Sequence, residues 1–144
     1  MSAETFFTDV QKETIVKAIG DAEAKTNGEI RVHIEEKCKG DVVKRAENIF
    51  GELKMQETAE RSGVLFYLAI DSRVFGIYGD KGINEKVPSD FWNTISAKME
   101  EEFRKENFTE GLCIGIAMAG EKLSLYFPKA ADNSNELSNE ISFR

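Results

Sequence analysis

Histidine, cysteine, proline and tryptophan are all scarce in this chain, and the scarcity excludes several kinds of site. The 144 residues include one histidine, two cysteines, two prolines and one tryptophan. A zinc site built from several histidines is therefore excluded. Cys38 lies in a polar stretch and Cys113 in an apolar one, which predicts two free thiols in the reducing cytoplasm and no disulfide.

Positive charge and long apolar runs are also in short supply. The 19 lysines and arginines are outnumbered by 26 aspartates and glutamates, so the formal net charge is −7. Nucleic-acid binding needs clustered positive charge, and this balance argues against such a partner. No apolar run approaches the roughly 18 residues of a membrane span, and the first residues do not form a signal peptide. We therefore expect a cytoplasmic monomer without membrane insertion.

The order of hydrophobic periodicities predicts an α/β domain. Helical spacing of apolar residues is found after Thr8, after Asp41, after Val87 and after Asn107, and strand patterns occupy 30–35, 64–70 and 74–79. The helical crossover makes the first two strands parallel, and a three-residue turn makes the third antiparallel. The predicted fold is a small mixed sheet packed between helices in the order α-β-α-β-β-α-α, a Rossmann-like sandwich.

The rest of the chain is organised around residues 61–84, which are predicted to be a buried strand, a turn, a second strand and a glycine-punctuated loop. The two outer ends of this stretch should meet at one sheet edge beside Glu29. Glu29, Asp80 and Asn84 offer the oxygen ligands that calcium or magnesium prefers. Further ligand contacts are expected from five neighbouring residues, which are Arg61, Ser62, Gly63, Gly79 and Gly82.

Simpler readings of the same residues stay open. Asp80 and Asn84 also suit turn residues that hydrogen-bond their own backbone. A helix amide end near the loop favours an anion, and Arg61 suits a phosphate. His33 falls on the polar face of its strand and is predicted to be a surface histidine. Residues 1–128 form the predicted domain, and 129–144 form a loosely held polar tail in which Leu137, Ile141 and Phe143 dock on the domain.

Several short motifs give the chain a resemblance to a known family. It resembles the TPM domain over residues 6–127, and looks most like a compact bacterial branch of that family. The matching motifs are Phe6-Phe-Thr8, Thr26-Asn-Gly-Glu-Ile30, Arg61-Ser-Gly-Val-Leu65, Gly79-Asp-Lys-Gly-Ile83, Phe108-Thr-Glu-Gly111, Asn135-Glu-Leu137 and Glu140-Ile-Ser-Phe143. The resemblance implies helices around a small mixed sheet, divalent-cation binding, and the acid-phosphatase activity ascribed to plant relatives.

One departure from the family pattern bears on function. Many members have Asp-Asn-Gly before the second strand, where this chain has Arg61-Ser62-Gly63. The leading hypothesis is a binding module with a calcium or magnesium site, which leaves room for a protein partner. The alternative is a metal-assisted phosphomonoester hydrolase, in which Asp80 or Glu29 positions the metal and Arg61 holds the phosphate.

Overall fold

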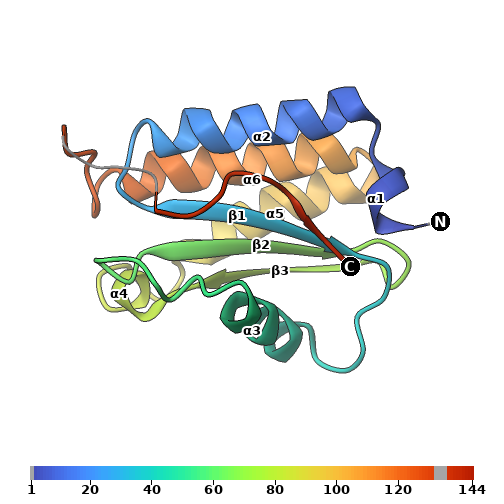
Figure 1. The fold of residues 1–144 in the computed structure, drawn as a ribbon, viewed down its shortest axis with the longest axis horizontal. Helices are drawn as coiled ribbons and strands as arrows, with labels where there is room; N and C mark the ends of the chain where they lie inside the picture. The colour runs from blue at the N-terminus through green and yellow to red at the C-terminus, as the bar shows by residue number, and fades with distance from the viewer. Residues whose placement is uncertain (1, 132–135) are drawn as a thin grey trace.

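The computed structural model describes residues 2–131 and 136–144. The helices are α1 (Ala3–Phe6), α2 (Asp9–Glu23), α3 (Val42–Glu52), α4 (Lys81–Asn84), α5 (Phe91–Arg104) and α6 (Phe108–Leu123), and the strands are β1 (Glu29–Glu35), β2 (Gly63–Ala69), β3 (Val74–Gly79) and β4 (Ser142–Phe143). The strands form one sheet in the order β3-β2-β1-β4. The α/β prediction is confirmed, with the short elements α1, α4 and β4 added to the expected order (Figure 1).

The two strand pairings expected from the sequence are both present. Strand β1 pairs in parallel with β2, and β2 pairs antiparallel with β3 across the short turn. All seven residues of β2 are buried, as its continuous apolar run requires. Strand β1 is almost fully buried, because the C-terminal segment contacts Glu29 and His33 on its polar face, Arg45 contacts Glu35, and β4 pairs with its outer edge.

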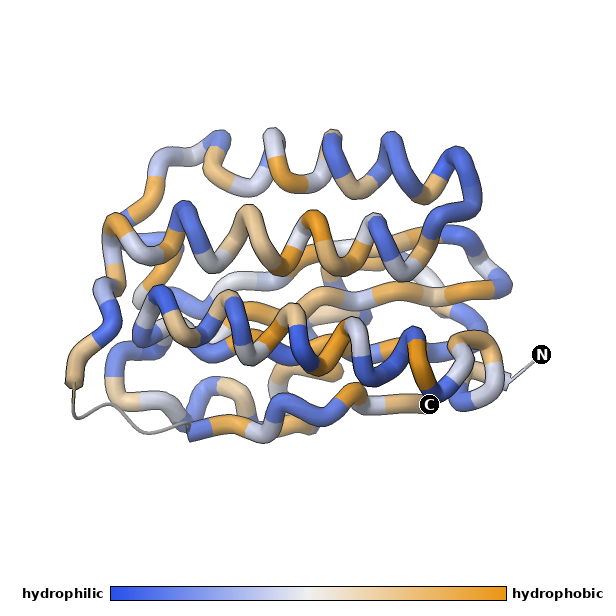
Figure 2. The backbone as a smooth tube through the Cα atoms, turned by 90° about the horizontal axis from the view of Figure 1, so that it is seen from above, coloured by the Kyte–Doolittle hydropathy of each residue, from blue (hydrophilic) through white to orange (hydrophobic). Residues whose placement is uncertain are grey.

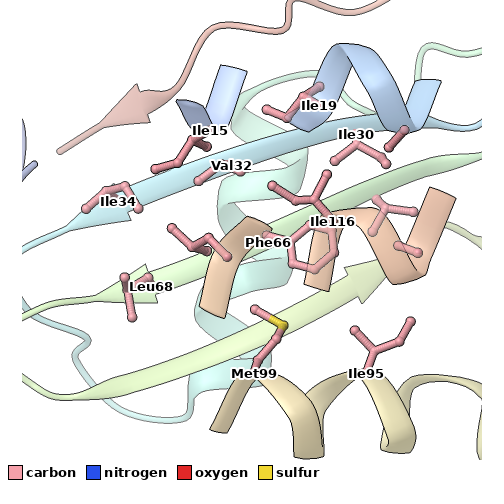
Figure 3. Close-up of a cluster of buried hydrophobic side chains, with 14 of the residues drawn as sticks. Ile15, Ile19, Ile30, Val32, Ile34, Phe66, Leu68, Ile95, Met99 and Ile116 are labelled. Carbon is pink, nitrogen blue, oxygen red and sulfur yellow. The ribbon is translucent and has the colours of Figure 1, made fainter. Parts of the chain in front are cut away.

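The sheet separates two layers of helices. Helices α2, α6 and α5 lie side by side over one face, and α3 lies alone on the other (Figures 1 and 2). The larger core fills the space under the three helices, where alternate residues of β1 and β2 meet isoleucines and methionine from the helices (Figure 3). On the opposite sheet face, Leu65 of β2 packs against Ile49 and Phe50 of α3, and Tyr67 and Ala69 pack against Ala46 of the same helix.

Helix α6 packs closely because small residues recur along it. A Cβ on Gly111 would lie 2.4 Å from the ring of Phe103, and one on Gly120 would lie 2.6 Å from the Cβ of Ala22. These contacts are with α5 and α2, so α6 is held between two neighbouring helices. The glycine side of α6 is therefore a packing surface.

Helix starts are predicted with mixed success. A capping box starts α2, with Gln11 N donating to the Thr8 hydroxyl at 3.1 Å, and Asp41 caps α3. Asn107 occupies the N-cap position of α6 but makes no side-chain cap bond there. The sequence predicts that a helix starts within Val87–Asp90, and the structure places the N-cap of α5 at Asp90, the last of these residues. Val87 N still donates to Ile83 O at 3.0 Å, so the turn of α4 must end before α5 can begin at Phe91.

The C-terminal segment 136–144 lies along the outer edge of β1. Arg144 N donates to Ile34 O at 2.9 Å, and a guanidinium nitrogen of Arg31 donates to Glu140 O at 3.1 Å. Ile141 and Phe143 pack against the larger core and Leu137 against the smaller one. This segment is therefore part of the sheet, and residues 132–135 of the predicted tail lie outside the described residues. None of the helices in the described part of the chain is long and apolar enough to cross a membrane.

The close approach of α6 to α2 gives a stability prediction. We expect Gly120→Ala to destabilise the protein by about 1–3 kcal/mol, because the new methyl group meets both the Cβ and the backbone of Ala22. Gly51→Ala in α3 is the matched control. No atom lies within 4 Å of its added Cβ, so helix propensity alone should stabilise that variant by up to about 1 kcal/mol. Urea unfolding of both variants measures the difference, and equal effects would contradict the packing argument.

Candidate functional site

The sheet edge predicted from the sequence is assembled as expected in its backbone. Glu29 and Gly63 are register partners at the start of β1 and β2. Asp80 N donates to Gly63 O at 2.9 Å, so Asp80 lies beside Gly63 on the side away from Glu29. The amino ends of two parallel strands and the end of β3 therefore meet at one edge.

The carboxylate of Asp80 is already bound inside the molecule. Its two oxygens accept hydrogen bonds from Arg61, from Nε at 2.7 Å and from a terminal nitrogen at 2.9 Å. One oxygen also accepts from Lys81 N at 2.8 Å, which makes Asp80 the N-cap of α4. The expected loop at 80–84 is thus a short helix, and Arg61 supplies the positive charge that a metal would bring.

Glu29 holds the C-terminal segment. Its side chain is buried, and one oxygen accepts from Glu136 N at 2.9 Å and from Leu137 N at 2.8 Å. Burial raises the pKa of Glu29 in spite of these two bonds. To coordinate a metal through this oxygen, Glu29 would have to give up its bonds to the C-terminal segment.

The remaining predicted site residues fix the local backbone. Asn84 Nδ2 donates to Gly79 O at 2.9 Å. Ser62 is buried, and its amide donates to the hydroxyl of Thr58 at 3.0 Å. The bond of Asn84 to nearby backbone agrees with the alternative interpretation, in which Asn84 is a turn residue.

The three predicted site glycines are required for close contacts within the fold. A Cβ on Gly63 would lie 2.9 Å from Met55 O, and one on Gly82 would lie 2.1 Å from Glu60 O. At Gly79 the new atom would lie 2.8 Å from the ring of Trp92. Each glycine is therefore explained by packing, whether or not a ligand approaches it.

This edge, as arranged, does not fit a divalent cation. Residues 2–131 and 136–144 contain no group of three or more His, Cys, Asp or Glu side chains that could hold a metal ion. Arg61 would have to leave Asp80, and the C-terminal segment would have to release Glu29, before either carboxylate could coordinate one. Cation binding by Glu29, Asp80 and Asn84 stays a prediction.

Glu23 lies beside the same edge and is the group most sensitive to pH near neutrality. One of its oxygens accepts from Ile30 N at 2.8 Å, and the residue is 7% exposed. Burial, reinforced by the nearby charge of Glu29, raises the pKa of Glu23 to about 7. The folded protein therefore favours the protonated form of this carboxyl group.

The opposite end of the sheet contains an open cleft of about 900 Å³. It lies at the carboxyl ends of β1 and β2, about 20 Å from the predicted edge at the usual rise per strand residue. Five basic side chains and four carboxylates are among its lining residues, which are Glu35, Glu36, Lys37, Lys39, Gly40, Asp41, Lys44, Arg45, Asn48, Asp71 and Arg144.

The charges of the cleft are unevenly paired. In the described part of the chain, no carboxylate lies within 4.0 Å of the ammonium groups of Lys37, Lys39 or Lys44. By contrast, two of the carboxylates are engaged. Glu35 is bound by Arg45, and Asp41 accepts from Lys44 N at 3.1 Å as the α3 cap. Among the described residues, Glu36 and Asp71 are in no ion pair either. The unpaired charges of the cleft are therefore three ammonium groups and two carboxylates, which leaves an excess of positive charge.

A buried polar network forms the inner wall of the cleft. Glu35 accepts from two nitrogens of Arg45, each at 2.8 Å, and from the hydroxyl of Tyr67. The ring of His33 lies 3.3 Å from the same carboxylate on one side and 2.9 Å from the Ser142 hydroxyl on the other. Burial alone would raise the pKa of Glu35, but the bonds from Arg45, Tyr67 and His33 lower it to about 2.

The prediction that His33 is a surface residue is wrong. Its side chain is buried, stacks on Tyr67 of β2 and contacts Ser142 of the C-terminal segment, and burial lowers its pKa although Glu35 acts in the other direction. Alternation along β1 identified the polar face correctly. It could not show that Arg45 and Ser142 would bury that face. The basic residues at 37, 39, 44 and 45 were the sequence signal for the cleft.

The comparisons with known proteins agree with this architecture. The family model for the TPM domain matches residues 1–122. The chain therefore belongs to the TPM domain family, and the family resemblance found in the sequence is confirmed. The search of curated proteins gave no match.

Three solved structures place this member within the family fold. The BA42 protein of the psychrophilic bacterium Bizionia argentinensis sp. nov. is 46% identical, with a TM-score of 0.93 over 98% of this chain and 97% of that chain. The N-terminal domain of a protein from P. gingivalis is 17% identical, with a TM-score of 0.69 over 85% and 80% of the two chains. The N-terminal domain of cg2496 from Corynebacterium glutamicum is 14% identical, with a TM-score of 0.66 over 96% and 80%. The last two likenesses show the fold alone.

The ion pair at the predicted edge gives a test of cation binding. We expect Arg61→Asn to raise calcium affinity by about tenfold, because it frees the Asp80 carboxylate from a competing cation. Asparagine also tolerates the positive φ of 52° at this position. Arg73→Asn is the matched control, with a similar φ of 55° and a surface ion pair to Glu106. Calorimetric titration measures both, and equal calcium affinity in the two variants would rule out a site at Asp80.

The raised pKa of Glu23 gives a pH prediction. Protonation favours the folded state, so this group stabilises most below its ordinary pKa of 4.5, and the contribution is lost as pH rises through about 7. Glu23→Gln should therefore gain stability relative to the unmodified protein between pH 5 and pH 8, by on the order of 1–3 kcal/mol. The exposed Glu13→Gln in the same helix is the control. Urea unfolding across this range measures the difference, which must depend on pH for the assignment to hold.

Proposed function

We propose that this TPM-domain protein is a binding module, and that the cleft at the carboxyl ends of β1 and β2 takes an anionic group such as a phosphate or a carboxylate. The observation that carries the proposal is the set of unpaired ammonium groups around the cleft, contributed by Lys37, Lys39 and Lys44. Phosphates and carboxylates are the groups that such charges recognise.

The position of the cleft supports the same proposal. In α/β sheets, ligands bind outside the carboxyl ends of the strands, where connecting loops leave a crevice. Here the loop that follows β1 carries Lys37 and Lys39, and the first turns of α3 carry Lys44 and Arg45. The loop after β1, the start of α3 and the C-terminal segment therefore all contribute charged side chains to the cleft.

Arg144 connects the proposed ligand with the C-terminal segment. It lines the cleft, its amide is bound to Ile34 O, and its guanidinium lies 2.7 Å from a carboxylate oxygen of Glu52. That ion pair is exposed and contributes little to stability, so the guanidinium is free to turn toward an anion. Ligand binding should therefore favour the docked position of residues 136–144.

Hydrolysis of phosphomonoesters is the alternative function. It would require Asp80 or Glu29 to position a metal, yet Asp80 is bound by Arg61 and Glu29 by the C-terminal segment. Both carboxylates also stand at the far end of the sheet from the cationic cleft. These arrangements favour binding, and hydrolysis would be supported by turnover of p-nitrophenyl phosphate that is lost in Asp80→Ala.

Inorganic phosphate is the simplest probe of the cleft. We expect its titration to shift the amide resonances of residues 36–45 and 71, and Lys44→Ala to weaken binding about two- to fivefold. Arg144→Ala should weaken it similarly and also shift residues 136–144. Added salt should weaken binding in every variant, because exposed charges are screened.

Lys98→Ala is the control for this titration. Lys98 is exposed on α5, pairs with Glu101 at 3.8 Å and does not line the cleft, so its removal lowers the net charge and breaks only an exposed ion pair. Equal loss of phosphate affinity in Lys98→Ala and Lys44→Ala would contradict a localised site. Shifts confined to residues 61–63 and 79–84 would instead place the ligand at the edge predicted from the sequence.

A further inference from the structure

A second cavity of about 530 Å³ opens at the same end of the sheet as the charged cleft. Most of its wall is apolar, and its lining residues are Val42, Leu68, Ala69, Ile70, Arg73, Val74, Phe75, Glu100, Phe103, Arg104 and Phe108. Its volume lies in the range of small-molecule sites, which are concave, mainly apolar and equipped with a few polar groups. We call it the apolar pocket.

The apolar pocket and the charged cleft share a wall. Asp41 lines the cleft and Val42 lines the pocket, so the first turn of α3 has one cavity on each side. The end of β2 repeats this arrangement, because Ile70 faces the pocket and Asp71 the cleft. Consecutive residues of the chain therefore line the two cavities at both places.

We propose that the ligand of this protein is an amphipathic anion, with its charged head in the cleft and its apolar body in the pocket. This inference rests on the proposed function, which assigns the anionic group of the ligand to the cleft. It adds that the rest of the ligand is apolar and binds in the pocket. A phosphate or carboxylate with an alkyl or aryl substituent has this chemistry.

The walls of the pocket support an apolar occupant. Phe75 and Phe103 pack edge to face with ring centres 4.9 Å apart, and Phe108 stacks on Phe103 at 5.7 Å. They form a continuous aromatic wall, on which an alkyl chain or an aryl ring buries surface favourably.

The polar groups of the pocket leave its interior apolar. Arg73 pairs with Glu106 at 3.1 Å, and Arg104 pairs with Glu100 at 2.6 Å. All four side chains are at least half exposed, so these pairs lie at the mouth. The anionic head is thus better placed among the unpaired lysines of the cleft than at this mouth.

A series of phosphates of increasing apolar size tests the inference. Inorganic phosphate, ethyl phosphate, butyl phosphate and hexyl phosphate are titrated below their micelle concentrations, and binding is followed by amide chemical shifts. We expect affinity to rise by about fourfold for each methylene group that enters the pocket. The longer probes should shift residues 68–75 and 103–108 in addition to the cleft residues.

A pair of neighbouring variants provides the control. Val42→Thr keeps the shape of the side chain but places a hydroxyl group in the pocket, which should weaken hexyl phosphate about tenfold and leave inorganic phosphate unchanged. Val43→Thr, at a residue that is 61% exposed and lines neither cavity, should change neither affinity. Unchanged binding of inorganic phosphate also shows that each variant is folded.

The outcomes separate this inference from the proposed function. If inorganic phosphate binds in the cleft and longer alkyl chains do not raise the affinity, the apolar part of the ligand is ruled out and the proposed function stands. Failure of every probe to bind overturns both proposals. If hexyl phosphate shifts the resonances of the pocket residues but not those of the cleft residues, the two cavities do not bind one ligand together. Resonances near the pocket that broaden with protein concentration show a second copy as its occupant and also overturn the inference.

Discussion

The buried carboxylate of Glu35 is the interaction on which much of this fold depends. It stands on β1, and its partners are Arg45 on α3, Tyr67 on β2 and His33 on β1 itself, which in turn contacts Ser142 on β4. Loss of Arg45 would leave a negative charge without compensation in the interior, and such a loss is costly. A single charged group therefore holds α3 against the sheet and connects it to the C-terminal strand.

The polar face of β1 explains why the C-terminal segment is part of the fold. Glu29 and His33 are buried only because residues 136–144 supply amides and a hydroxyl group to them. The segment in turn gains few buried apolar contacts, from Leu137, Ile141 and Phe143. The segment is therefore held by hydrogen bonds to buried polar groups and by strand pairing at the edge of the sheet, in addition to the hydrophobic effect. The short strand β4 provides this pairing.

Most of the fold follows from periodicity, but the state of the candidate residues does not. The alternation of β1, the apolar run of β2 and the capping box at Thr8 each depend on neighbours in the sequence, so they can be predicted. Whether Asp80 is free depends on Arg61, nineteen residues earlier. Burial of His33 depends on Ser142, which is 109 residues later. Such partners are fixed by tertiary structure, and local patterns carry no information about them.

The two ends of the sheet differ because of how their charges are neutralised. At the amino ends of β1 and β2, Arg61 and the C-terminal backbone satisfy the carboxylates, and glycines remove the space between segments. At the carboxyl ends, the loop after β1 is rich in lysines whose charges have no counterpart among the described residues within ion-pair distance. An incoming anion could approach these three ammonium groups without breaking an ion pair of theirs. A ligand at the amino ends would have to break two structural contacts. Because a ligand would break fewer structural contacts there, the comparison favours the carboxyl ends of β1 and β2 for the proposed binding site of this TPM domain.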